Sequence, residues 1–341
     1  MEQKHIILTE IKEQASVAKA MFKREHDKDV LDIVDLINRT LNSDGEIYLV
    51  GSGSSYYAAV FASHLFAKNN HFIASAILAG DFDSYIPDLG RRDLVVIYSQ
   101  SGNNPTILDG LHHIAQRLAK TALITNDVDS PLSNRCDLIL PLEIGKEKAV
   151  PATKSFFAEI LFTSLMSEAL KDGSELFSAR ENLLNEIARI TSENYYSKLD
   201  GIAKYLAGSD NIYVLGEGIE YANAQEAALK FKECAQLSAE AYIASEFLHG
   251  PIAALKKGMP VIMFTDNQSD IAKQVADKIK AAGGAIIAVG EQNLPQSDAF
   301  IPLKGFGLFS GLVSIIPLQL LAYKIALEKG LNPDKPPGVE K

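Results

Sequence analysis

The sequence predicts an α/β protein made of two tandem domains, each a doubly wound, parallel five-stranded sheet flanked by helices. Apolar strand-like runs alternate with helical segments, which is typical of a parallel sheet covered on both faces. The pattern also occurs twice, because residues 212–218 (IYVLGEG) resemble residues 47–53 (IYLVGSG) at a displacement of 165 residues. We therefore interpret the chain as a tandem duplication of one α/β domain.

The expected elements follow one another in a simple order. Two helices come first, at residues 7–25 and 29–42. Apolar runs then predict strands of the first sheet, and helical periodicity fills the intervals between them. The strands are 46–50, 94–98, 121–125 and 138–142, and the helices are 56–68, 105–119 and 153–170. The second copy repeats these strands at 212–216, 261–264 and 285–289, and residues 305–327 predict a buried core helix.

This order predicts a division of the chain into five parts. The parts are N-terminal helices (1–44), a first domain (45–173), a helical connector (174–208), a second domain (209–330) and a C-terminal tail over the active site (331–341).

Composition excludes several classes of function. The net charge of −10 argues against nucleic acid as a partner, because a phosphate backbone requires a basic patch. The two cysteines, Cys136 and Cys234, form no metal-binding spacing, so no metal is expected. We find no signal peptide and no uninterrupted apolar run of about 18 residues. We therefore expect a cytoplasmic protein without a membrane segment.

Two polar loops follow strands of the first sheet and precede helices. They are Gly51–Ser55 (GSGSS) and Ser99–Gly102 (SQSG). Ligands of doubly wound sheets bind at the carboxyl ends of strands, where helix N-termini favour anions. Neither loop contains lysine or a GxxxxGK[ST] motif, so a single phosphate on a small polyol fits better than a nucleotide. The alternative interpretation is helix capping and tight turns.

The second copy has lost this chemistry. Its loop, residues 265–268, reads TDNQ, with an acid and no glycine. We expect this loop to hold an anion poorly, so the chain carries one complete site.

A second functional segment is Glu226–Pro251. As a helix it places Glu226, Lys230 and Glu233 at i, i+4 and i+7 on one face, with Lys232 on another. His249 follows shortly before the helix-breaking Pro251. A carboxylate, an amine and an imidazole together make a proton-transfer set. The alternative is a solvated helix face with an ordinary ion pair.

Taken together, these motifs resemble the sugar isomerase (SIS) domain family in its tandem form. The resemblance includes the isomerase half of glucosamine-6-phosphate synthase and, more closely, the shorter glucosamine-6-phosphate deaminases. The segments that carry it are 52–55, 99–102, 147–156, 227–233, 239–242, 246–251 and 332–341.

The resemblance implies roles for individual residues. The phosphate would be bound by Ser99, Gln100, Ser101 and Asn104, where Asn104 stands in place of a threonine frequent in the family. The sugar would be bound by Ser52, Gly53, Ser54, Ser55, Val150, Ala152 and Glu340.

The resemblance also implies a catalytic set. His249, reaching across from a neighbouring subunit, would open the sugar ring, which implies a homodimer with shared active sites. Glu233 would move a proton between C1 and C2, and Lys230 would stabilise the developing oxyanion. Lys341 would form a Schiff base or assist ring opening. No cofactor is expected.

The expected reaction is conversion of glucosamine 6-phosphate to fructose 6-phosphate and ammonia. The chain begins directly with the helices that precede the sheet, so we expect no glutaminase domain in it and no use of glutamine. The alternatives are a glutamine-independent aminotransferase-like isomerase, a fructosamine-6-phosphate deglycase and a non-catalytic phosphosugar sensor.

Overall fold

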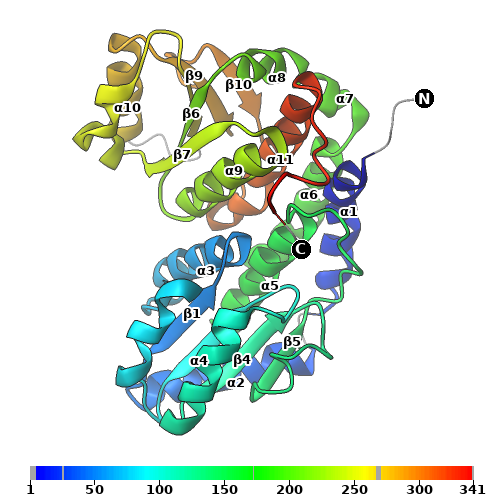
Figure 1. Ribbon diagram of the computed structural model, residues 1–341, viewed down its shortest axis with the longest axis vertical. Coiled ribbons are helices and arrows are strands. Elements are labelled where there is room, and N and C mark those ends of the chain that lie inside the picture. The colour runs from blue at the N-terminus through cyan, green and yellow to red at the C-terminus, as the bar shows by residue number, and fades with distance from the viewer. Residues whose placement is uncertain (1–4, 25–26, 172, 266–269, 340–341) are drawn as a thin grey trace. The chain divides into compact units, whose positions relative to one another are not determined.

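The computed structural model describes residues 5–24, 27–171, 173–265 and 270–339, and it divides into two compact units (Figure 1). The first-sheet unit comprises residues 16–147 and 154–180. The second-sheet unit comprises residues 1–15, 148–153 and 181–341, as far as these are described. Each unit is described by itself.

The first-sheet unit contains five parallel strands in the order β2-β1-β3-β4-β5. Every strand pair is parallel; helices or short helical turns lie between β1 and β2, between β2 and β3 and between β3 and β4, whereas β4 and β5 are joined by a loop. The strands are β1 (Ile47–Gly51), β2 (Ser75–Leu78), β3 (Leu94–Tyr98), β4 (Lys120–Thr125) and β5 (Leu138–Pro141).

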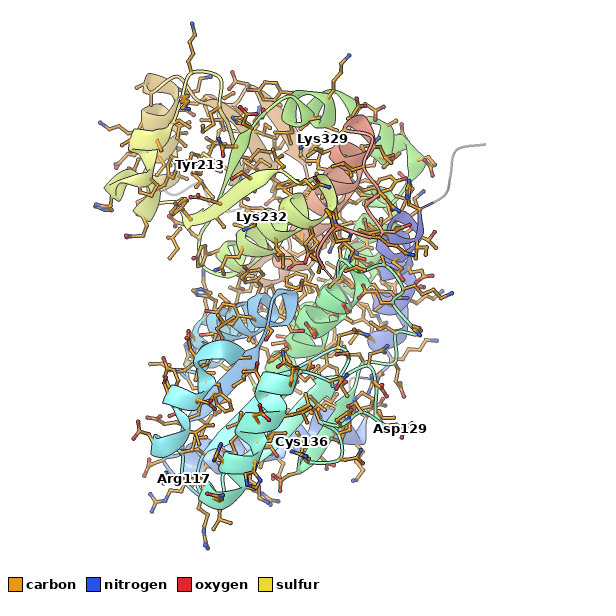
Figure 2. The ribbon with its side chains drawn as sticks, viewed as in Figure 1. Arg117, Asp129, Cys136, Tyr213, Lys232 and Lys329 are labelled. Atoms are coloured by element: carbon orange, nitrogen blue, oxygen red, sulfur yellow. The ribbon has the colours of Figure 1, made fainter. Side chains whose placement is uncertain are left out.

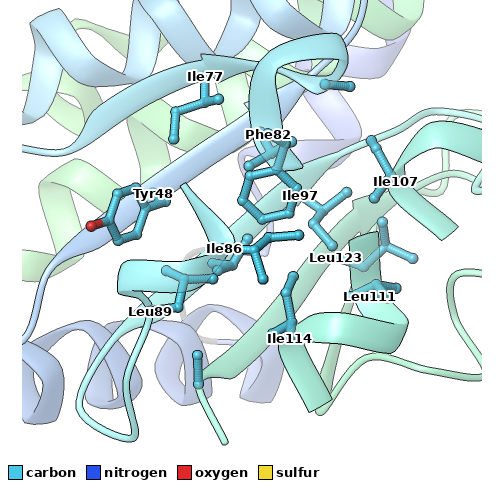
Figure 3. Close-up of a cluster of buried hydrophobic side chains, with 14 of the residues drawn as sticks. Tyr48, Ile77, Phe82, Ile86, Leu89, Ile97, Ile107, Leu111, Ile114 and Leu123 are labelled. Carbon is cyan, nitrogen blue, oxygen red and sulfur yellow. The ribbon is translucent and has the colours of Figure 1, made fainter. Parts of the chain in front are cut away.

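Helices cover both faces of this sheet. Side chains alternate between the two faces along each strand, and one face presents Tyr48, Ile97 and Leu123. Phe82 and Leu111 pack on that face (Figure 3). The helices of the unit are α2 (Lys28–Asn42), α3 (Ser54–Leu65), α4 (Pro105–Arg117) and α5 (Lys154–Leu170), with shorter turns η1 (Phe66–Asn70), η2 (Ala79–Ser84) and η3 (Ile86–Asp88). Helix α5 packs against α2 and α3.

The second-sheet unit repeats the same strand order. Its parallel sheet runs β10-β9-β8-β6-β7, so β6 takes the place of β1 and β7 the place of β2. The strands are β6 (Asn211–Gly216), β7 (Ser238–Ile243), β8 (Pro260–Phe264), β9 (Ala285–Gly290) and β10 (Ala299–Pro302).

Helices α9 and α11 form the interior of this unit, lying side by side in Figure 1. Its helices and turns are α7 (Glu193–Ser197), α8 (Asp200–Ala207), α9 (Ile219–Ala235), α10 (Asp270–Ala281), α11 (Gly311–Glu328), η4 (Glu246–His249), η5 (Pro251–Ala254) and η6 (Gly307–Phe309). Helices α1 (Ile6–Met21) and α6 (Glu175–Ile190) each include the point at which the division between units falls.

One helical stretch of the described chain, Gly307–Glu328, is long and apolar enough to cross a membrane. Within its apolar window, 94% of the residues are buried inside the fold. The predicted buried helix at 305–327 is therefore confirmed as a core element, with α11 beginning at Gly311.

The duplication is visible in the geometry of the two loops that open α3 and α9. Gly53 and its counterpart Gly218 have φ values of 54° and 57° with ψ values of −128° and −125°. Both conformations lie where only glycine is unstrained. The two halves therefore share a backbone turn as well as a strand order.

The predicted fold class is confirmed, and the differences concern short or terminal elements. Strands β2, β7 and β10 were not identified individually from sequence, because β2 and β7 are edge strands with largely exposed or half-buried residues and β10 is short. The first helix ends at Met21 instead of continuing to residue 25, and α3 begins at Ser54 and gives way to a π-helical turn at Phe66. The connector is broken into α6, α7 and α8.

Candidate active site

The loop after β1 presents serine hydroxyls at the carboxyl edge of the first sheet. Ser52 is exposed, and Ser54 begins helix α3. The Ser55 hydroxyl donates a hydrogen bond to the buried carboxylate of Glu159, at 2.8 Å. The proton of Ser55 is therefore committed within the protein, and its oxygen remains suited to accept a hydrogen bond from a sugar hydroxyl.

The loop after β3 is a tight turn that leaves its polar side chains outside the sheet. The Gly102 amide donates to the Ser99 carbonyl at 3.1 Å, and the Asn126 amide donates to the Gln100 carbonyl at 3.0 Å. Ser99 is buried, Gln100 is half-buried and Ser101 is exposed. Helix α4, with 13 residues, begins directly after this loop and directs its amide dipoles toward it.

Asn104 connects the two loops. Its Oδ1 accepts the Ile107 amide at 3.1 Å and so caps helix α4. Its Nδ2 donates to the Ser52 hydroxyl at 2.9 Å. Both ends of this amide side chain have partners in the protein, so Asn104 holds Ser52 against the loop of residues 99–102. Its predicted contact with phosphate stays a prediction.

The second predicted set lies on helix α9 of the second-sheet unit. Lys230 is only 1% exposed; its ammonium lies 3.5 Å from the Glu226 carboxylate and donates a hydrogen bond to Glu233. Glu226 is also fully buried, whereas the Glu233 side chain retains 17% exposure. The face is therefore buried, and the alternative of a solvated helix face is wrong. Lys232 is exposed on another face of α9, as predicted (Figure 2).

Electrostatics keep Lys230 charged despite its burial. Burial alone would lower the pKa of Lys230, but the carboxylates of Glu226 and Glu233 outweigh it, so the pKa is raised. A fixed positive charge beside a partly exposed carboxylate can stabilise a negative oxygen while that carboxylate exchanges a proton. The neighbouring Cys234 is no competing nucleophile, because burial raises the pKa of its thiol to about 12.

The remaining predicted site residues lie outside helix α9 and the two loops of the first-sheet unit. His249 is exposed at the end of η4, followed by Gly250. Val150 and Ala152 are half-buried in segment 148–153 of the second-sheet unit. Glu340, Lys341 and positions 266–268 of the TDNQ loop lie outside the described residues. The described residues contain no group of three or more His, Cys, Asp or Glu placed to hold a metal ion.

Sequence reasoning missed Glu159, the acceptor for Ser55. The second unit contains a counterpart with exchanged residues, in which the Ser314 hydroxyl donates to Glu220 at 2.7 Å. Glu220 stands 165 residues after Ser55, the displacement of the duplication. Ser314, however, stands only 155 residues after Glu159, so the repeat aligns one member of each pair and gave no sequence signal for the other.

The fold and these residues define a duplicated α/β protein with hydroxyl-rich loops in one unit and a buried lysine–glutamate set in the other. The SIS domain family matches residues 40–169 and 205–297. The chain belongs to the SIS domain family.

Individual relatives agree with this assignment. The chain is 31% identical over 316 residues to a glutamine–fructose-6-phosphate aminotransferase (isomerizing) of Sulfolobus acidocaldarius, which covers 91% of this chain and 52% of that protein. The corresponding protein of Clostridium tetani is 30% identical over 99% of this chain and 58% of its own length. The chain thus spans little more than half the length of these curated relatives.

Solved structures share the fold over nearly the whole chain. The C-terminal domain of glucosamine-fructose-6-phosphate aminotransferase from Francisella tularensis superimposes with a TM-score of 0.84 and 26% identity, covering 98% of this chain and 99% of that one. A glucosamine-6-phosphate deaminase from Thermotoga maritima gives a TM-score of 0.76 and 26% identity, covering 98% of each chain.

Proposed function

We propose that this protein is a phosphosugar isomerase that acts as a deaminase, converting glucosamine 6-phosphate to fructose 6-phosphate and ammonia. The observation that carries the proposal is the buried Lys230 held between Glu226 and the partly exposed Glu233. Binding a sugar phosphate does not require a buried ammonium beside a carboxylate, whereas moving a proton at carbon next to a carbonyl does.

The proposed reaction has three stages. His249 transfers a proton that opens the aminosugar ring, and ring opening produces the C1 aldehyde. Glu233 then removes the C2 proton, and the charge that develops on the C1 oxygen is stabilised by Lys230. Return of the proton to C1, with transfer of an amine proton to the C1 oxygen, leaves a hydroxyl at C1 and an imine at C2. Water then hydrolyses the imine to a ketone and ammonia.

Support for the substrate comes from the loops and the relatives together. The SQSG turn has the exposed hydroxyl of Ser101 and the side-chain amide of Gln100 as donors, and the N-terminus of α4 follows it; such groups suit one phosphate. The Sulfolobus and Francisella relatives and the Thermotoga deaminase all carry names that refer to hexose 6-phosphates.

We propose a cytoplasmic homodimer in which His249 serves the neighbouring subunit, since its side chain is exposed. Lys341 is proposed to form a Schiff base with the ketose or to assist ring opening.

A second candidate is the reverse reaction, amination of fructose 6-phosphate. The named aminotransferases among the relatives favour it. The same proton transfer serves both directions, so the substrates supplied decide between them. Ammonium as the only required nitrogen source would indicate the glutamine-independent isomerase, and a requirement for glutamine would indicate a synthase.

The experiment supplies glucosamine 6-phosphate, galactosamine 6-phosphate and fructoselysine 6-phosphate separately and measures released ammonia or lysine. We expect ammonia from glucosamine 6-phosphate. Lysine released from fructoselysine 6-phosphate alone would instead identify a deglycase. Binding of a phosphosugar without any product, in either direction, would identify a sensor and refute the enzymatic proposal.

Glu233→Gln tests the catalytic assignment within the same assay. We expect a loss in kcat of at least about 100-fold, because general acid–base groups contribute about that much or more. Lys232→Gln is the matched control, since Lys232 is exposed on the adjacent position of α9. Full turnover by Glu233→Gln would refute the assignment.

A further inference from the structure

Segment 148–153 of the second-sheet unit is held by three consecutive backbone amides. The amides of Lys148 and Ala149 both donate to the carboxylate of Glu10, the latter at 3.2 Å. The next amide, that of Val150, donates to the backbone carbonyl of Asp334 at 3.0 Å. Glu10 is buried, with 3% exposure, so these bonds lie out of competition with water.

Asp334 also fixes the beginning of helix α1. One carboxylate oxygen accepts the Ile6 amide at 2.9 Å and the other accepts the Ile7 amide at 2.8 Å. The ring of His5 lies 3.4 Å from the same carboxylate. A negative charge on the free amides at a helix N-terminus is stabilising, so the C-terminal tail and α1 are fastened together at this residue.

The far end of the segment is fixed by a buried amide pair. The Gln319 side chain of α11 donates to the Thr153 carbonyl at 3.3 Å. Its Oε1 accepts the Gln14 side-chain amide at 2.6 Å, and both glutamines are buried. Helix α1 therefore contacts the start of the segment directly, through Glu10. It also supports the end of the segment indirectly, because Gln14 holds the Gln319 side chain that bonds Thr153.

We propose that Asp334 and Glu10 are positioning residues for substrate binding, which fix the backbone of segment 148–153 so that Val150 and Ala152 meet the sugar. This inference rests on the proposed function for the sugar contacts of these two residues. Small residues contact a ligand through backbone atoms and short side chains, which cannot reorient to follow it. A displacement of about 0.5 Å is then enough to weaken the contact. Asp334 bonds α1 through its carboxylate and the segment through its backbone carbonyl, so removing the carboxylate frees α1 from the tail and loosens the backbone that holds Val150.

The test compares Asp334→Ala with Asp298→Ala. Asp298 lies in the same unit and also accepts a backbone amide, that of Ile286 at 2.7 Å, together with Lys280. Replacing Asp298 by alanine removes hydrogen bonds of the same kind as those of Asp334, at a position far in sequence from segment 148–153. We expect Asp334→Ala to raise KM for the phosphosugar about tenfold with a smaller change in kcat, and to speed hydrogen exchange at residues 148–150. Asp298→Ala should change neither.

Two results would overturn the proposal. One is unchanged KM and exchange in Asp334→Ala; the other is an equal change in both variants, which would indicate general destabilisation. If Asp334→Ala fails to fold, Asp334→Asn and Glu10→Gln replace it, since each keeps an acceptor oxygen and should give a smaller shift in the same direction. Exchange and calorimetric affinity need no turnover, so they test the positioning role even if the proposed reaction fails.

Discussion

The side chain of Asn104 caps helix α4 and also donates a hydrogen bond to Ser52, at 2.9 Å, across 52 residues of sequence. One amide thus sets the start of the helix that follows residues 99–102 and the position of the loop of residues 51–55. The two functions require different atoms, Oδ1 and Nδ2, so they can be separated by substitution.

We expect Asn104→Ala to lower the free energy of unfolding by about 1 kcal/mol, the usual cost of a lost N-cap, and to weaken phosphosugar binding several-fold. Asn104→Ser retains a good N-cap but cannot reach Ser52. It should therefore keep most of the stability and show the same loss of affinity. Urea unfolding and calorimetric titration measure the two effects, and wild-type affinity in Asn104→Ser would show that the bond to Ser52 does not matter.

Gly53 and Gly102, which have positive φ in the loops of residues 51–55 and 99–102, differ in the space around them. A Cβ on Gly102 would lie 1.9 Å from the Ser130 hydroxyl oxygen, whereas a Cβ on Gly53 would meet nothing within 4 Å. Both residues have positive φ, 59° and 54°, so an alanine is strained at each position before any side-chain contact is considered.

Gly102→Ala should therefore destabilise the protein more than Gly53→Ala. We expect about 1–3 kcal/mol for Gly53→Ala from its glycine-only backbone conformation, and about 1–3 kcal/mol beyond the backbone strain for Gly102→Ala, from overpacking against Ser130. The measurement is the free energy of unfolding in urea. Equal losses would mean that Ser130 moves aside without cost.

Stability in acid should depend on Glu186 of helix α6. Its buried carboxylate accepts hydrogen bonds from Arg189 at 2.7 and 2.6 Å and from the Lys304 amide at 2.8 Å. Burial acts to raise the pKa of Glu186, but the hydrogen bonds from Arg189 and Lys304 outweigh it, so the pKa is lowered. A carboxyl with a lowered pKa stabilises the fold above its unfolded pKa of about 4.3, and this contribution is lost as the pH falls through the folded pKa.

Glu186→Gln should be less stable than the wild type at neutral pH. The difference in melting temperature should shrink as the pH falls below about 4.3. The exposed residue Glu217 supplies a control, since Glu217→Gln should leave the profile parallel to that of the wild type. A difference that stays constant down to pH 3 would contradict the role of Glu186.

Much of the fold could be predicted because its signals are local. The strands β1, β3 and β6 are continuous apolar runs, and the repeat of IYLVGSG as IYVLGEG revealed the duplication. Edge strands gave a weaker signal, since β2 has a single buried residue and packs on one side only.

For the candidate site, the sequence placed Lys230 and Glu233 on one face of a helix and Lys232 on another. Helical periodicity alone decides this, because residues three or four apart share a face. The loops of residues 51–55 and 99–102 were likewise located by the ends of their strands. Sequence could not decide whether the Lys230 face is solvated or buried, since that depends on the elements that pack against α9.

What the sequence determined by itself was therefore the alternation of strands and helices, the duplication and the residues that share a helix face. The tertiary structure decided which of these polar groups are buried and to what they are bonded. The Asp334 carboxylate meets the Ile6 amide across 328 residues, and Asn104 meets Ser52 across 52. Such contacts have no periodicity in the sequence, because they form only when distant segments pack together.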